Sequence, residues 1–146
     1  RPVVAYADLQ FDHHDKKYRF PLVLHEEPPP PAEYPLRLLT LVRRKFQHSQ
    51  IPHEQQNQPP DVWIAPDCPV LKNLELQKDI YLVSPLGRLK VSVHTLPGLY
   101  PQVVLYRRGD WINQGGGANQ LIDASLTDIG SGAAFYDQFA NLKNKI

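Results

Sequence analysis

Short hydrophobic runs separated by polar and proline-containing stretches make up most of the chain. The most regular pattern lies in residues 88–95, where Leu89, Val91 and Val93 alternate with polar side chains. Strict alternation is typical of a strand with one buried face. The apolar run at residues 80–83 is joined to this strand by residues 84–87, in which a proline precedes a glycine as in a tight turn. The pattern therefore predicts a β-hairpin over residues 80–95.

Three further runs predict strands at residues 36–42, 62–65 and 103–106. Asp67 belongs to a residue type that often caps a helix, and Pro69 is tolerated in a first turn, so we expect a short helix from Asp67 to about Leu76. The last stretch, residues 135–142, fits either a helix face or an aromatic strand, and both remain open. Short strands separated by regular turns favour a mainly β protein with short helices, either a small closed barrel or a sandwich.

A leader precedes this pattern. Residues 12–19 are polar, and residues 28–31 are four consecutive prolines. Such a run favours the extended polyproline II conformation and fits neither a helix interior nor a central strand. We interpret residues 1–33 as an extended, proline-rich leader or linker, with a recognition motif for a proline-binding module as the alternative. Residues 34–146 are expected to form one domain.

Composition narrows the function by exclusion. The 16 Lys and Arg residues balance 15 Asp and Glu residues, so we expect no nucleic-acid partner, which would require a concentrated basic surface. The one cysteine, Cys68, lies beside Asp67, which disfavours a reactive thiolate, and is expected to be a small, partly buried residue. No apolar run approaches the roughly 20 residues of a membrane span, so no membrane insertion is expected. The compartment is not determined, but a soluble, cytoplasmic protein is favoured.

The motifs of a self-contained enzyme are absent. The sequence has no phosphate-binding loop, dinucleotide fingerprint, nucleophile elbow or zinc-binding H-E-x-x-H. The adjacent His13 and His14 form a poor metal pair, because neighbouring side chains on a strand point to opposite faces. We therefore assign no catalytic residue and no metal ligand. Since the chain starts at Arg1 and has no methionine, we expect a fragment of a longer protein.

A glycine- and amide-rich loop is the best candidate for ligand binding. Residues 115–117 are three glycines, which allow a backbone to approach a ligand closely. Asn119 and Gln120 follow, and their amides both donate and accept hydrogen bonds. This combination suits a pterin or guanine ring, which carries alternating donors and acceptors. A mobile loop without a ligand is the alternative.

Read in order, these segments resemble the molybdopterin dinucleotide-binding domain, the C-terminal part of molybdopterin oxidoreductases such as formate dehydrogenases and nitrate reductases. The similarity covers about Tyr34 to Asn141. It is carried by the opening strand ending in threonine (34–40), the His-Ser-Gln segment (48–50), the strand with Pro and Asp (62–67), the hairpin (80–93), and the Asn-x-Leu and Ser-Gly signatures (118–121 and 126–132). In the family, Gly-Arg often follows the threonine directly. Here Leu41 and Val42 follow it, and Arg43 and Arg44 come next.

The resemblance implies a double-psi β-barrel that holds molybdopterin guanine dinucleotide, of which the parent enzyme carries two around a molybdenum or tungsten ion (bis-MGD). Its partners are then the other domains of that enzyme, and the domain is not catalytic by itself. By the same resemblance, the cofactor-binding residues are Thr40, Arg43, His48, Ser49, Asn119 and Gln120. Two other functions remain open: a non-enzymatic β-barrel interaction module, and a stand-alone small subunit of such an enzyme.

Overall fold

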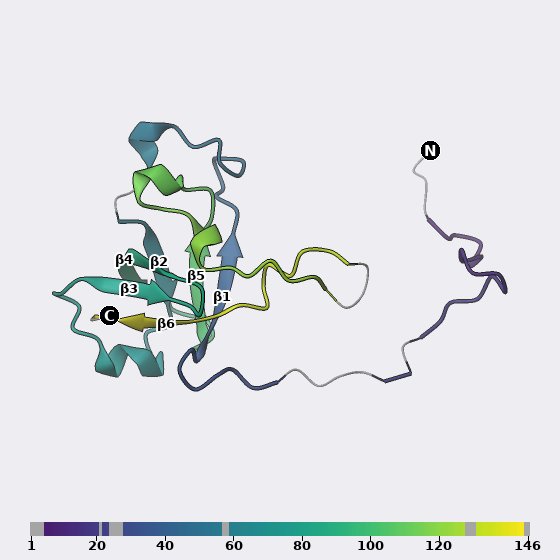
Figure 1. Cartoon of the computed structure of the whole chain (residues 1–146), viewed down its shortest axis with the longest axis horizontal. Helices are drawn as coiled ribbons and strands as arrows, with labels where there is room; N and C mark the ends of the chain where they lie inside the picture. The colour runs from purple at the N-terminus through teal and green to yellow at the C-terminus, as the bar shows by residue number, and fades with distance from the viewer. Residues whose placement is uncertain (1–4, 21, 24–27, 57–58, 128–130, 145–146) are drawn as a thin grey trace.

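Six short strands close into a barrel in the computed structural model, which describes residues 5–20, 22–23, 28–56, 59–127 and 131–144. The strands are β1 (Leu36–Leu41), β2 (Asp61–Ile64), β3 (Ile80–Val83), β4 (Arg88–Thr95), β5 (Val103–Arg107) and β6 (Phe139–Lys143). Around the barrel their order is β1-β5-β2-β4-β3-β6, with β6 returning to β1 (Figure 1).

Two strand pairs, β1 with β5 and β2 with β4, are parallel, and the other pairs are antiparallel. Within the described residues the helices are short 3-10 turns: η1 (His53–Gln55), η2 (Pro69–Asn73), η3 (Ile112–Gln114) and η4 (Ala118–Gln120). The closed barrel with short helices confirms the predicted mainly β fold class, and the two parallel pairs agree with a double-psi β-barrel. None of these helices is long and apolar enough to cross a membrane.

The barrel interior is filled from alternating positions of each strand. In β1 the buried residues are Leu36, Leu38 and Thr40, whereas Leu41 is exposed. The polar Thr40 therefore lies inside the barrel and the apolar Leu41 outside it. The apolar run in the sequence did not indicate this arrangement. The predicted hairpin is confirmed: β3 pairs with β4, and the amide of Ser84 donates to the carbonyl of Gly87 at 2.9 Å.

Two sequence predictions at element level need correction or completion. The predicted helix from Asp67 to Leu76 is wrong in length and cap, because only Pro69–Asn73 is helical and its N-cap is Cys68, without a side-chain capping bond. The backbone of Leu74 is extended and ends the helix there. The open choice for residues 135–142 resolves as strand β6, which pairs with both β1 and β3 and so closes the barrel.

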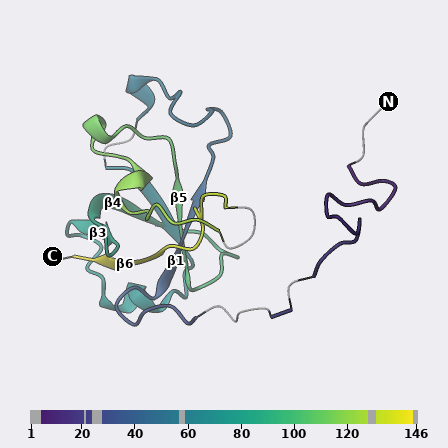
Figure 2. The ribbon, with the colours of Figure 1, turned by 45° about the vertical axis from the view of Figure 1, so that its right-hand side comes forward.

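The parallel pairing of β1 and β5 decides where the two longest loops lie. Because these neighbouring strands run in the same direction, the segments that follow them, after Leu41 and after Arg107, leave the barrel at the same end. The described part of the leader contains turns but no strand or helix. It reaches the barrel at the opposite end and runs away from it in both views (Figures 1 and 2). The division into a leader and a domain at residue 34 stays a prediction.

Candidate functional site

A cavity of about 260 Å³ lies at the barrel end where β1 and β5 finish. His48 and Ser49 line it from the loop after β1, and Arg108, Asp110 and Asn119 line it from the segment after β5. These residues are far apart in the sequence and meet because the two strands are parallel neighbours. The backbone ladder continues past the strands, since the amide of Arg108 donates to the carbonyl of Leu41 at 2.9 Å.

Asp110 and Gly117, which line this cavity, belong to a buried polar network. The Asp110 side chain is only 2% exposed and forms an ion pair with the Arg43 guanidinium. Its second carboxylate oxygen accepts a hydrogen bond from the Tyr106 hydroxyl at 2.7 Å. The same hydroxyl accepts a hydrogen bond from the amide of Gly117 at 3.2 Å. Asp110 thus links Arg43, which follows β1, to Tyr106 in β5. Through the Tyr106 hydroxyl the network also reaches Gly117.

Burial and the negative charge of Asp110 raise the pKa of the Tyr106 hydroxyl well above its ordinary range. The hydroxyl therefore stays protonated and serves as a donor to the carboxylate at any physiological pH. The Arg43 charge compensates that of Asp110. A buried ion pair of this kind contributes little net stability, but removing one partner leaves an uncompensated buried charge.

Two glycines are required by the close packing of the site. A Cβ on Gly109, whose φ is +116°, would lie 2.1 Å from the carbonyl oxygen of His48. A Cβ on Gly116 would lie 2.3 Å from the Cβ of Asp110. Both clashes are with nearby backbone or with the first side-chain atom, which cannot move aside easily. Of the three glycines predicted to allow close approach to a ligand, Gly116 is thus required for a contact within the protein.

Trp111 ties the loop after β1 to the segment after β5. Its indole N–H donates to the carbonyl of Ser49 at 2.8 Å, and its backbone amide donates to the side chain of Gln56 at 2.9 Å. Gln56 is buried and in turn donates to the carbonyl of Ile51. The backbone of His48 has a φ of 49°, the left-handed region that a histidine seldom adopts. The loop is thus held in a defined shape against the cavity.

The structure brings together part of the predicted site. His48, Ser49 and Asn119 line the cavity, and their side chains form no hydrogen bond within the described part of the chain. Arg43 does not line the cavity, but it forms an ion pair with Asp110, which does. Thr40 is fully buried inside the barrel, and the Gln120 amide donates to the carbonyl of Gly116 at 2.6 Å. Cofactor contact by any of the six residues stays a prediction.

Sequence reasoning missed Tyr106, Arg108 and Asp110. The signal present in the sequence is a group of charged residues around Gly109, immediately after a buried strand. Their importance depends on the strand pairing, which the sequence does not reveal. Of the family signature at residues 126–132, Asp128, Ile129 and Gly130 lie outside the described residues.

Three buried polar atoms in this region find no hydrogen-bond partner among the described residues: Thr40 Oγ1, Arg43 Nε and Arg108 Nε. Buried polar atoms are nearly always satisfied in folded proteins, so these atoms can still accept a hydrogen-bond partner from outside the chain. Two of the three are guanidinium donors, which favour phosphate or carboxylate oxygens. The Arg108 guanidinium also lies over the ring of Phe135, 5.6 Å from its centroid. The residues present therefore fit a ligand that carries an anionic group.

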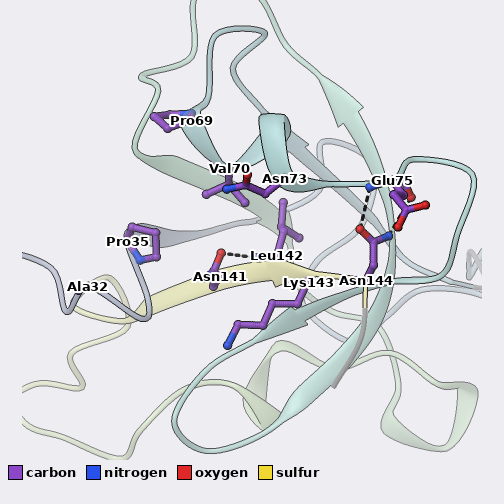
Figure 3. A pocket seen from close by; sticks show the side chains of 10 residues that line it. All are labelled: Ala32, Pro35, Pro69, Val70, Asn73, Glu75, Asn141, Leu142, Lys143 and Asn144. Atoms are coloured by element: carbon purple, nitrogen blue, oxygen red, sulfur yellow. Dashed lines mark hydrogen bonds between the residues drawn. The ribbon is translucent and has the colours of Figure 1, made fainter.

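A larger hollow of about 520 Å³ lies elsewhere, between η2 and β6 near the start of β1 (Figure 3). Several of its polar side chains are hydrogen-bonded within the protein. Asn144 accepts from the amide of Glu75 at 2.7 Å and donates to its carbonyl at 2.8 Å. The Asn141 amide donates to the carbonyl of Glu33 at 2.8 Å. With these groups already used, the hollow offers little for ligand recognition.

No group of three or more histidine, cysteine, aspartate or glutamate residues suited to a metal ion occurs among the described residues. No family model matches the sequence, and no curated protein matches it. Among solved structures, the chain is similar to part of the acetylene hydratase from Pelobacter acetylenicus, with a TM-score of 0.66 and 14% sequence identity. The match covers 84% of this chain and 21% of that chain. This likeness shows a shared fold, and the chain spans about a fifth of the neighbour's length.

Proposed function

We propose that this chain is the cofactor-binding domain of a larger molybdenum or tungsten oxidoreductase, and that the cavity beyond β1 and β5 holds part of a molybdopterin guanine dinucleotide. The observation that carries the proposal is the meeting of His48 and Ser49 with Asn119. The family resemblance named these residues from two distant segments, and they line one cavity with free polar side chains. The fold shared with a domain-sized part of an acetylene hydratase supports the same class of domain.

The residues have distinct roles in this proposal. The Asn119 amide presents a donor and an acceptor to the edge of a pterin or guanine ring. Arg108 supplies a buried guanidinium donor for a phosphate oxygen, and Asp110 holds Arg43 in place nearby. When bound, the cofactor supplies electron chemistry through its metal and dithiolene sulfurs. The chain binds and orients the cofactor and contributes no catalytic residue.

The size of the cavity also supports a domain that acts with partners. Pockets that enclose a drug-sized ligand measure about 300–1,000 Å³. At about 260 Å³ the cavity accommodates one ring or a diphosphate, but not a whole dinucleotide. Other domains of the parent enzyme would therefore supply the remaining walls, and the isolated chain should bind weakly. The barrel match to 21% of the neighbour's length is consistent with such an arrangement.

The test is an amide chemical-shift titration of the chain with GDP, which stands in for the guanine dinucleotide half, and with ADP as the comparison. Saturable shifts from GDP alone, clustered at residues 48–49 and 108–120, support the proposal. Asn119→Ala should weaken GDP binding about fivefold, because one hydrogen bond contributes about 1 kcal/mol. Asn73→Ala is the matched control, since Asn73 is also exposed and also in a 3-10 helix.

Absence of shifts at millimolar GDP would contradict the assignment of these site residues. It would favour the alternative of a β-barrel interaction module. Equal shifts from GDP and ADP would show a nucleotide site without base selectivity, which argues against a guanine-specific role.

A further inference from the structure

The proline run that precedes the barrel takes no part in the site described above. Residues 28–31 are four prolines, whose rings fix φ near −65° and favour a polyproline II helix. This helix has three residues per turn and no internal hydrogen bonds. Its carbonyl groups therefore remain available to outside donors, and its ring faces remain available to aromatic side chains.

The barrel provides such side chains where the run passes. Pro28, Pro29 and Pro30 line a groove of about 330 Å³ together with Tyr100 and Phe139. Arg37, Gln102 and Val103 complete the barrel side of the groove. The Tyr100 side chain is 65% exposed, so its ring and hydroxyl are accessible to a ligand.

Contacts within the barrel hold the aromatic wall of the groove in place. The Arg37 guanidinium lies 5.2 Å from the centroid of the Phe139 ring, and it donates to the carbonyl of Tyr136 at 3.0 Å. Arg37 also pairs with the Asp137 carboxylate at 3.2 Å. These contacts hold the Phe139 ring in place at the start of β6. A rigid aromatic wall binds a preformed polyproline helix with little loss of conformational entropy.

The chain is anchored to the barrel immediately after the prolines. The Asn141 amide donates to the carbonyl of Glu33 at 2.8 Å, and the Lys143 ammonium lies 3.3 Å from the Glu33 carboxylate. Figure 3 shows Ala32 and Pro35 beside Asn141 of β6. This anchor keeps the proline run next to the groove at a high effective concentration, which makes even a weak interaction effective.

We propose that Tyr100, Phe139 and Arg37 form a polyproline-binding wall and that the chain's own segment 28–30, which lines the opposite side of the groove, closes onto it. The groove lies at the barrel end opposite the candidate cofactor cavity, because it is built from the starts of β1 and β5. Contact between this segment and the wall fixes the direction in which the leader leaves the barrel. This role is independent of cofactor binding.

The experiment compares amide and side-chain chemical shifts of the full chain with those of a variant in which Pro28, Pro29, Pro30 and Pro31 are all changed to serine. Signals of Tyr100, Gln102 and Phe139 should shift, while signals at the cofactor cavity should not. A synthetic peptide of residues 28–35, added at millimolar concentration, should return the groove signals of the variant towards wild type. Changing His13 and His14 to serine is the control, because it alters the leader outside the run.

Unchanged groove signals in the serine variant would show that the prolines only pass the barrel, and the proposal would be wrong. Shifts that the peptide does not reverse would also overturn the proposal. The prolines would then lie near the groove because the chain holds them there, and the groove would have no affinity of its own for them. As a further check, Tyr100→Ala should abolish the peptide response in the serine variant. A persisting response would place the peptide elsewhere.

Discussion

Tyr106→Phe is the sharpest test of the buried network at the cavity. The substitution keeps the ring and removes only the hydroxyl, so no large void is created. Asp110 then loses the donor at 2.7 Å, and the amide of Gly117 loses its acceptor at 3.2 Å. A hydrogen bond to a charged group contributes about 1.5–3 kcal/mol, and a buried amide left unpaired costs about 1–3 kcal/mol. Since such terms overlap, we expect a loss of about 3 kcal/mol in the free energy of unfolding.

The assay is urea unfolding followed by circular dichroism, with stability taken from the midpoint at an unchanged slope. Tyr136→Phe is the matched control, because that side chain is 45% exposed and its hydroxyl makes no hydrogen bond within the described residues. It should change stability by less than about 0.5 kcal/mol. Asp110→Asn should cost more than Tyr106→Phe, about 3–5 kcal/mol, because Arg43 is then left as an uncompensated buried charge. If Tyr106→Phe and Tyr136→Phe were equally stable, the network would not hold the site together.

Three further outcomes are expected. Gly109→Ala should destabilise the fold and shift the amide signals of His48, because the added Cβ would meet the His48 carbonyl oxygen at 2.1 Å; unchanged shifts would contradict the packing described. Burial raises the pKa of Tyr106 above its ordinary 10.0, so the unfolded chain releases this proton first as the pH rises. The free energy of unfolding should therefore fall above about pH 10, and Tyr106→Phe should make that fall shallower in pH-dependent denaturation. Cys68 is 2% exposed, so a thiol reagent should label it much more slowly in the native chain than in urea; equal rates would disprove its burial.

Local pattern was sufficient to predict the parts of the fold that local chemistry determines. The alternation of Leu89, Val91 and Val93 reports a strand with one buried face, and the turn after Ser84 joins it to its neighbour. The β1 run was ambiguous in one respect. Its apolar residues do not reveal that Thr40 lies inside the barrel and Leu41 outside, because this depends on which face meets the other strands.

The candidate site divides in a similar way. The order of motifs was enough to single out His48, Ser49 and Asn119, which the structure places on one cavity. It did not single out Asp110 or Tyr106, because their contacts arise only when β1 and β5 pair in parallel. The predicted helix at Asp67 was wrong for a related reason. A good capping residue does not make a cap when the helix begins one residue later, and here Cys68 occupies the N-cap position.

The strand order has a consequence for how the protein is made. Among the residues that the structure describes, strand β1 pairs with β5 and β6, which come after the other barrel strands in sequence. During synthesis its residues, Leu36–Leu41, leave the ribosome long before either partner, and both of its edges stay open while β2, β3 and β4 are completed. Open apolar strand edges are sites of mispairing and aggregation. Contacts between such distant segments also slow folding. Nascent chains that end before β5 should therefore depend on chaperones more than the finished protein does.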